Sequence, residues 1–353
     1  MRPPRLWPAI LFLALCACGD PLPRISLITE MDIFGSRVEV VGDEARSSPR
    51  PGESATFALS VVYPERVISD AQFSMAVLEC TFPDLYTSVP VCQEFISAFT
   101  SQDASANDVK DALPMLDANF ACTEDAVIPI GPLTLRCVVG HRDFEFSVPE
   151  EVQGERRLFT GILCRNSNPV ARSSGGLPGF SCKPKKGSSA KVESESFYSS
   201  AVVAYEEDQE NQNPDGEPAV VQLDGDEWPV YSGNQPPKDT QCDASNNELP
   251  QLSHQTEYTL RIAYPRKARE KVNGTFETLR ISHRATSGSF QRSASYILPD
   301  RKPANDGNLE VETKWTSPAK QDKGHRVIRF VFGIRDGRGG FGMSERYACR
   351  PEK

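Results

Sequence analysis

The sequence lacks the short motifs that mark common enzymes and metal centres. It contains no Gly-x-Ser-x-Gly, His-Glu-x-x-His or P-loop segment, and no Cys-x-x-Cys. Its histidines stand singly, at His141, His254, His283 and His325. Because a zinc site draws on clustered cysteine and histidine, this scatter argues against zinc. We expect a protein that is not an enzyme.

Long apolar runs are also missing after the N-terminal segment, so no transmembrane helix is predicted. The formal net charge is -9, and an acidic chain is unsuited to nucleic acid or to holding anionic lipid by charge. We therefore expect no nucleic-acid partner. Charged residues make up 25% and hydrophobic residues 39% of the chain, as in globular proteins with a packed core.

The first residues follow the plan of a secretory signal. Arg2 and Arg5 precede the apolar run Leu6–Leu15, and the small residue Ala17 stands before Cys18. The apolar run is too short to cross a bilayer. An ordinary signal peptide, cut after Ala17 or Gly19, is one interpretation.

A second interpretation comes from Leu15-Cys16-Ala17-Cys18, which resembles the bacterial lipobox. The resemblance implies cleavage before Cys18 and lipid on its sulfur, so that 1–17 is the signal and 18–24 a tether. More than one acyl chain on one residue anchors a protein stably in a membrane. Since Gly19 rather than Asp follows the cysteine, the outer membrane is favoured. We expect an exported protein held to the cell envelope, with an envelope protein as its partner.

The remaining cysteines are even in number, which in an exported protein predicts disulfides. Spacing alone does not determine their connectivity. The expected strand order favours two pairs, Cys164 with Cys182 and Cys242 with Cys349. The full set of candidates is Cys80, Cys92, Cys122, Cys137, Cys164, Cys182, Cys242 and Cys349.

An internal repeat predicts the fold. Ala55–Pro64 aligns without gaps on Thr256–Pro265, and apolar residues fill every second position of both, as in a strand with one buried face. The first copy is longer, and we place its insertion at about 81–131, with a short helix at 107–116. Two further pairs of strands match in the same order, namely Gln72–Cys80 with Thr275–Ser282 and Leu158–Asn166 with Ile328–Asp336.

Short strands separated by Pro, Gly, Asn and Asp predict an all-β fold. Three segments, Ala285–Phe290, Lys314–Pro318 and Val331–Gly340, resemble immunoglobulin-like or PKD-like modules of bacterial surface proteins. With the repeat, this resemblance implies two tandem immunoglobulin-like β-sandwich domains, at 25–205 and 218–353. We expect a strand at Phe197–Tyr205 to close the first, with 165–196 as the loop before it.

An acidic linker is predicted at 206–217. Glu210–Pro214 resembles the interdomain linker of cadherins, where Asp and Asn oxygens help bind calcium. Asn211, Asn213 and Asp215 are the candidate calcium ligands, because calcium takes several oxygen ligands. Gln212 stands where an acid is expected, and a solvated acidic linker is the alternative. We expect no other cofactor.

Two further patterns receive a structural interpretation. Gly337–Gly342 satisfies Gly-x-Gly-x-x-Gly, but too few residues follow for a dinucleotide fold, so a β-turn is predicted. Lys183–Lys186 is expected to be an exposed loop.

The function we expect is a non-catalytic binding or structural module at the envelope. The alternatives are an enzyme accessory, or a glycan or small-ligand binder in which Trp228 and Trp315 would stack on the ligand.

Overall fold

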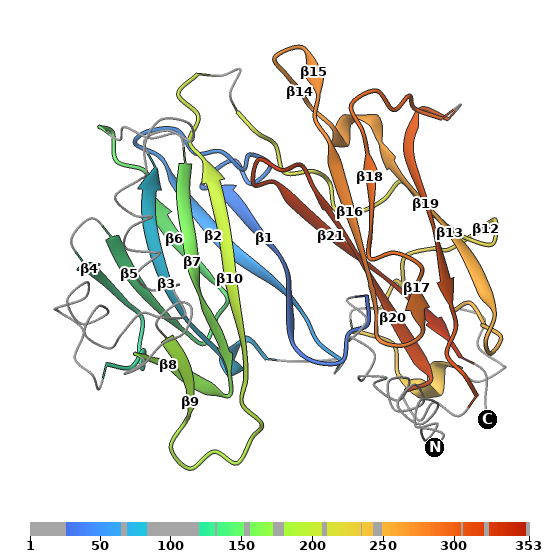
Figure 1. The fold of residues 1–353 in the computed structure, drawn as a ribbon, viewed down its shortest axis with the longest axis horizontal. Coiled ribbons are helices and arrows are strands. Elements are labelled where there is room, and N and C mark those ends of the chain that lie inside the picture. The colour runs from blue at the N-terminus through green and yellow to red at the C-terminus, as the bar shows by residue number, and fades with distance from the viewer. Residues whose placement is uncertain are drawn as a thin grey trace, which may run out of the picture.

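The computed structural model describes residues 26–350 except for 65–68, 83–119, 131–132, 152–155, 172–179, 207–209, 234, 243–248, 305 and 321–324. In these residues the fold is all-β, as predicted, and consists of antiparallel sheets (Figure 1). Short 3₁₀ helices are η1 (Asp70–Gln72), η3 (Asp239–Cys242) and η4 (Arg266–Ala268).

The N-terminal half forms a first sandwich of two sheets. The three-stranded sheet has the order β1-β2-β6, and the five-stranded sheet has the order β10-β7-β3-β5-β4. Strands β8 and β9 pair as a separate hairpin. The strands are β1 (Asp32–Val40), β2 (Ser54–Val62), β3 (Phe73–Phe82), β4 (Ala126–Ile130), β5 (Leu133–Val139), β6 (Asp143–Ser147), β7 (Arg156–Arg165), β8 (Ser167–Ala171), β9 (Phe180–Pro184) and β10 (Glu193–Val202).

The C-terminal half forms a second sandwich from sheets of order β12-β11-β13-β19-β17 and β18-β16-β20-β21, beside the hairpin β14-β15. Its strands are β11 (Val220–Leu223), β12 (Asp226–Glu227), β13 (Glu257–Pro265), β14 (Lys271–Val272), β15 (Thr275–Phe276), β16 (Leu279–Ala285), β17 (Ser289–Phe290), β18 (Ala294–Ile297), β19 (Asn308–Thr316), β20 (Val327–Arg335) and β21 (Phe341–Cys349).

The strand orders of the two sandwiches correspond. The run β1-β2-β6 matches β11-β13-β19, and β10-β7-β3-β5 matches β21-β20-β16-β18. The repeat had paired β2 with β13, β3 with β16 and β7 with β20, and these strands occupy equivalent places. The agreement favours an origin by duplication.

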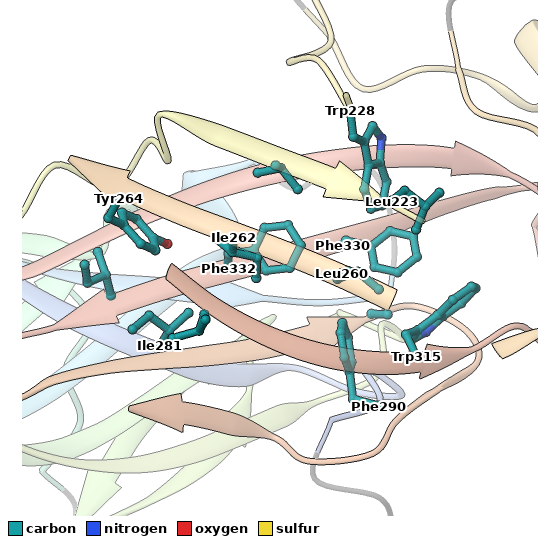
Figure 2. Close-up of a cluster of buried hydrophobic side chains, with 14 of the residues drawn as sticks. Leu223, Trp228, Leu260, Ile262, Tyr264, Ile281, Phe290, Trp315, Phe330 and Phe332 are labelled. Atoms are coloured by element: carbon teal, nitrogen blue, oxygen red, sulfur yellow. The ribbon is translucent and has the colours of Figure 1, made fainter. Parts of the chain in front are cut away.

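Apolar side chains of alternate strand positions fill each sandwich. Figure 2 shows the core of the second, where Phe330 lies between Trp228 and Trp315 with ring centroids 4.8 Å from each. Both indoles are buried, at 2% and 0% exposure. Trp228 Nε1 donates to the Tyr347 carbonyl and Trp315 Nε1 to the Ser287 carbonyl. Neither tryptophan can offer a stacking face, which removes the basis of the glycan-binding alternative.

Three disulfides brace the described residues. Cys164–Cys182 and Cys242–Cys349 form as expected, with Cα atoms 5.6 and 5.4 Å apart. Cys122–Cys137 ties the region of the predicted insertion to β5. Cys80 is also disulfide-bonded, whereas Cys92 and the helix expected at 107–116 lie outside the described residues. Because disulfides persist in oxidising compartments, they indicate an exported protein.

Three sequence-based boundaries were wrong. The strand expected at Thr275–Ser282 is broken, because β15 ends at Phe276 and β16 begins at Leu279. Residues 165–196 are not one loop: they hold the hairpin β8-β9, and β10 begins at Glu193. The first residues assigned to the first sandwich instead pair with the second, since Ile28 N donates to the Ala285 carbonyl at 2.8 Å.

No helix within the described residues is long and apolar enough to span a bilayer. The signal, the tether and Cys18 lie outside these residues.

Candidate functional site at the junction of the two sandwiches

The outer face of β20 and β21 is covered by the first sandwich. Phe34 of β1 packs edge-on against Phe341 of β21, with ring centroids 6.2 Å apart. Gly35 and Gly333 permit this approach, because a Cβ would lie 2.5 Å from the Phe341 ring at the first and 2.6 Å from the Phe34 ring at the second. Burial of apolar surface from both sides fixes the two sandwiches against each other. The cluster is completed by Ile28, Val62 and Val331.

The predicted linker is built into this junction. Asn211 is fully buried, and its backbone pairs with the first sandwich through Ser47 N, which donates to the Asn211 carbonyl at 2.7 Å. Its Nδ2 donates to Ser47 Oγ and to Asp336 Oδ2 of the second sandwich, both at 2.7 Å. One amide group therefore bonds both sandwiches. The described part of 206–217 is accordingly anchored to both sandwiches at Asn211, although Glu206, Gln212, Asp215 and Glu217 are exposed.

Asp336 is the buried acceptor at the centre of the junction, with 5% exposure. Besides the Asn211 amide, its Oδ1 accepts the backbone N–H groups of Arg338 at 2.7 Å and Gly340 at 3.0 Å. Burial raises the pKa of its carboxyl, and these hydrogen bonds oppose that rise.

Arg338 connects the turn after β20 with neighbouring carboxylates. It pairs with Glu270 at 2.6 Å and with Glu277 at 3.3 Å, and it donates to the Glu210 carbonyl of the linker at 3.2 Å. Burial and the charges of Asp336 and Glu270 raise the pKa of Glu277, the backbone N–H of Glu270 and the charge of Arg338 oppose the rise, and the resulting pKa is about 7.

Glu210 in turn holds the linker to the first sandwich. Its carboxylate pairs with Arg50 and lies 3.5 Å from the guanidinium of buried Arg46. Arg46 also pairs with Glu53 at 2.8 Å. The hydrogen bond to Glu53 and the surrounding carboxylates raise the pKa of Arg46, although burial opposes them.

The glycine-rich segment is a turn, as predicted, and it lies against the first sandwich. Gly337 and Gly339 have φ angles of +82° and +111°, in the region that glycine adopts readily. A Cβ at Gly339 would meet the Ser200 carbonyl of β10 at 2.9 Å, and one at Gly342 would meet Gly216 Cα at 2.5 Å. The glycines thus permit backbone-to-backbone contact between the turn, the linker and β10.

Asn213 and Asp215, two of the three candidate calcium ligands, use a side-chain oxygen for another partner, whereas the buried Oδ1 of Asn211 accepts no hydrogen bond from the described residues. Asn213 Nδ2 donates to the Val38 carbonyl at 2.7 Å, and its Oδ1 accepts Phe341 N at 3.3 Å. Asp215 Oδ1 accepts the backbone N–H of Glu217 at 3.1 Å. Asn211 and Asn213 therefore serve as bridges between the sandwiches. In the described ranges, no group of three or more His, Cys, Asp or Glu side chains could hold a metal ion.

A cavity of about 200 Å³, here called the junction cavity, opens beside this interface. Ile33, Leu59 and Phe197 supply its apolar surface. Ser36 Oγ of β1 and Ser199 Oγ of β10 share a hydrogen bond at 2.5 Å. The full lining is Ile33, Gly35, Ser36, Leu59, Glu195, Ser196, Phe197, Tyr198, Ser199 and Arg335.

Glu195 is the carboxylate of the junction cavity. Alternation along β10 places it on the same face as the buried Phe197 and Ala201. Burial raises the pKa of Glu195, and the charges of Asp32 and Glu30 raise it further. An edge strand that carries an inward-facing charge also resists pairing with other strands.

Arg335 is the cation of the junction cavity. Its guanidinium donates to the Phe34 carbonyl and lies 5.4 Å from the centre of the Phe341 ring. Arg280 of β16 lies opposite Arg335 of β20 in the strand register. Burial lowers the pKa of Arg335, and the charges of Arg280 and Arg284 lower it further. Of these three arginines, only Arg284 forms an ion pair with a described carboxylate, Asp32 at 3.4 Å.

A second cavity, of about 300 Å³, lies beside Tyr231 and Tyr347, whose rings are 5.9 Å apart. Its two carboxylates already have cationic partners, because Glu217 pairs with Arg346 and Glu345 with Arg329. The junction cavity is therefore the stronger candidate. The lysine-rich segment 183–186 is largely exposed, as expected, but it is not wholly a loop, because Lys183 and Pro184 end strand β9.

Sequence reasoning missed Glu195 and Arg335. The signal for Glu195 was weak, because its face of β10 carries Phe197 and Ala201 but also Glu193 and Ser199. Arg335 gave no such signal, since its role depends on contact between strands that are far apart in the chain.

No protein-family model matches the chain, and no curated protein matches it. Among solved structures, it is similar over 93% of its length to Escherichia coli alpha-2-macroglobulin activated by porcine elastase, with 9% identity and a TM-score of 0.19, and it spans 22% of that chain. It is also similar over 90% of its length to a structure described as manganese lipoxygenase of Gaeumannomyces graminis and partial zonadhesin of Komagataella pastoris, spanning 93% of that chain with 9% identity and a TM-score of 0.15. Scores this low carry no argument about function.

Proposed function

We propose that this protein is a lipid-anchored component of the bacterial cell envelope that binds a partner without catalysing a reaction. The lipobox-like segment ending at Cys18 supports the anchor, and the disulfides support export. The matched strand orders support two immunoglobulin-like domains derived by duplication.

The observation that carries the binding role is the fixed junction. Asn211 bonds both sandwiches, and Phe34 is packed onto the outer face of the second. The junction cavity draws its walls from both sides of this interface. Because binding surfaces gain affinity when they are already ordered, a rigid junction with a concave, charged lining suits recognition.

The lining supports binding rather than catalysis. The hydroxyls of Ser36 and Ser199 bond to each other, whereas a nucleophilic serine needs a neighbouring general base. The two charged side chains, Glu195 and Arg335, are of opposite sign and are suited to holding a ligand in one orientation.

A photo-crosslinking amino acid at the rim of the junction cavity tests the binding role. Tyr198 on the edge strand β10 is 70% exposed, and Val127 on β4, at the opposite edge of the same sheet, is 61% exposed. We expect a discrete crosslinked envelope protein from position 198 and none from position 127 in living cells. Equal capture at both positions, or none at either, would contradict the proposal.

The anchor has its own test. We expect radiolabelled palmitate to enter the wild-type protein and not Cys18→Ser, and the labelled protein to sediment with outer-membrane fractions. Label that persists in Cys18→Ser would refute the assignment of Cys18.

A further inference from the structure

We infer that the junction cavity binds a small zwitterionic ligand, an amino acid or short peptide whose ammonium group meets Glu195 and whose carboxylate meets Arg335. This inference rests on the proposed binding role and concerns the recess itself, whereas the envelope protein partner is expected at the rim, beside Tyr198. It does not depend on the lipid anchor.

The Glu195 side of the cavity favours a cation. The charges of Glu30 and Asp32 act on Glu195, and all three are acidic. Asp32 has a partner in Arg284, whereas no described residue donates a hydrogen bond to the Glu195 carboxylate. A half-buried carboxylate gains most from a donor that brings positive charge, and an ammonium group supplies three N–H donors.

The Arg335 side favours a carboxylate. Its guanidinium gives one of its five N–H donors to the Phe34 carbonyl, and the described residues supply no carboxylate partner for the others. Arg280 and Arg284 add positive charge nearby, with Asp32 as the opposing charge. Arginine recognises planar carboxylates through two parallel hydrogen bonds, so an α-carboxylate fits this wall.

Size and the remaining lining set the rest of the ligand. The cavity of about 200 Å³ lies below the roughly 300–1,000 Å³ of sites for drug-sized molecules, so a small ligand is indicated. Ile33, Leu59 and Phe197 offer apolar contact to short aliphatic side chains. The Ser36 and Ser199 hydroxyls can bond a peptide amide. Because this lining is recessed, it suits a discrete molecule better than a flat membrane surface.

Titration of the purified protein with three dipeptides tests both charges without changing the fold. The probes are alanyl-alanine, its N-acetyl form and its C-terminal amide, followed by NMR of backbone amides. We expect alanyl-alanine to give saturable shifts at residues lining the junction cavity. Loss of either charge removes a charge-assisted hydrogen bond, so each blocked probe should bind about tenfold more weakly or worse.

Two variants test which side chain recognises which charged group of the ligand. In Glu195→Gln, the preference for alanyl-alanine over its N-acetyl form should disappear, and in Arg335→Gln the preference over the amide should disappear. Glu145→Gln on β6, an exposed site outside the cavity lining, should bind like the wild type. Equal binding of all three probes, shifts away from the cavity, or no saturable shift would overturn the inference. If Arg335→Gln weakens the junction, the amide probe on the wild-type protein still decides the point.

Discussion

Replacement of Asn211 by Asp perturbs the junction at its centre while keeping the size of the side chain. In the wild type, the Asn211 amide donates to Asp336 Oδ2 at 2.7 Å in a fully buried setting. Asn211→Asp puts a second carboxyl group at that distance. Two carboxylates so close do not both ionise, so the pair keeps one proton, which can replace the lost hydrogen bond.

The free energy needed to keep the shared proton determines how far Asn211→Asp is destabilised. The shared proton gives the carboxyl pair of the folded variant a pKa above that of an unfolded aspartate. The stabilisation of the fold by the protonated pair is therefore fully present below about pH 4 and is lost as pH rises. With an unfolded pKa of about 3.9, keeping the proton costs about 1.5 kcal/mol at about pH 5 and about 4 kcal/mol at about pH 7. Asn211→Asp should therefore be destabilised by these amounts relative to the wild type.

Urea unfolding of both proteins at the two pH values measures the difference. Gln212→Glu is the matched control, because it adds the same charge at the next position, on an exposed side chain. The control should change stability little at either pH. If Asn211→Asp followed the wild type at both pH values, the interdomain role of Asn211 would be wrong.

Two further predictions concern stability. Burial raises the pKa of Glu277 from 4.5 to about 7, so the contribution of Glu277 to stability is present below about pH 4.5 and is lost as pH rises through about 7. In Glu277→Gln the free energy of unfolding should fall less over this range, as unfolding midpoints at several pH values would show. Opening Cys242–Cys349 by paired alanine substitution should destabilise the protein more than opening Cys164–Cys182, because their sequence separations are 107 and 18 residues. The loss of chain entropy that each bond imposes on the unfolded state gives about 5 against about 3 kcal/mol of stability. Calorimetry that ranked the two double variants in the reverse order would contradict this account.

The strands were predictable where one rule determines them. Ala55–Pro64 alternates apolar and polar residues because one face of β2 packs into the sandwich, and the same period appears in β13. Cys164–Cys182 and Cys242–Cys349 followed from the expected strand order. The predicted boundaries were wrong where one continuous strand was expected and the structure has two, β15 and β16.

The junction was not predictable, because its chemistry depends on tertiary contact. The composition of 206–217 is that of a solvated linker, and nothing local distinguishes Asn211, which is buried, from Gln212, which is exposed. Likewise, the cadherin-like pattern gave the asparagines a role as oxygen ligands, whereas their amide N–H groups bond groups far away in sequence.

The pairing of Leu27 with Ala285 determines which way the molecule faces if Cys18 carries lipid. The chain then leaves the membrane into the second sandwich, which becomes the base, and the first sandwich stands farther out. Tension on the anchor would load the second sandwich first. Since the two sandwiches are packed against each other, the outer sandwich would point in a direction set by the base, while the tether expected at 18–24 would let the height of the cavity above the lipid surface vary.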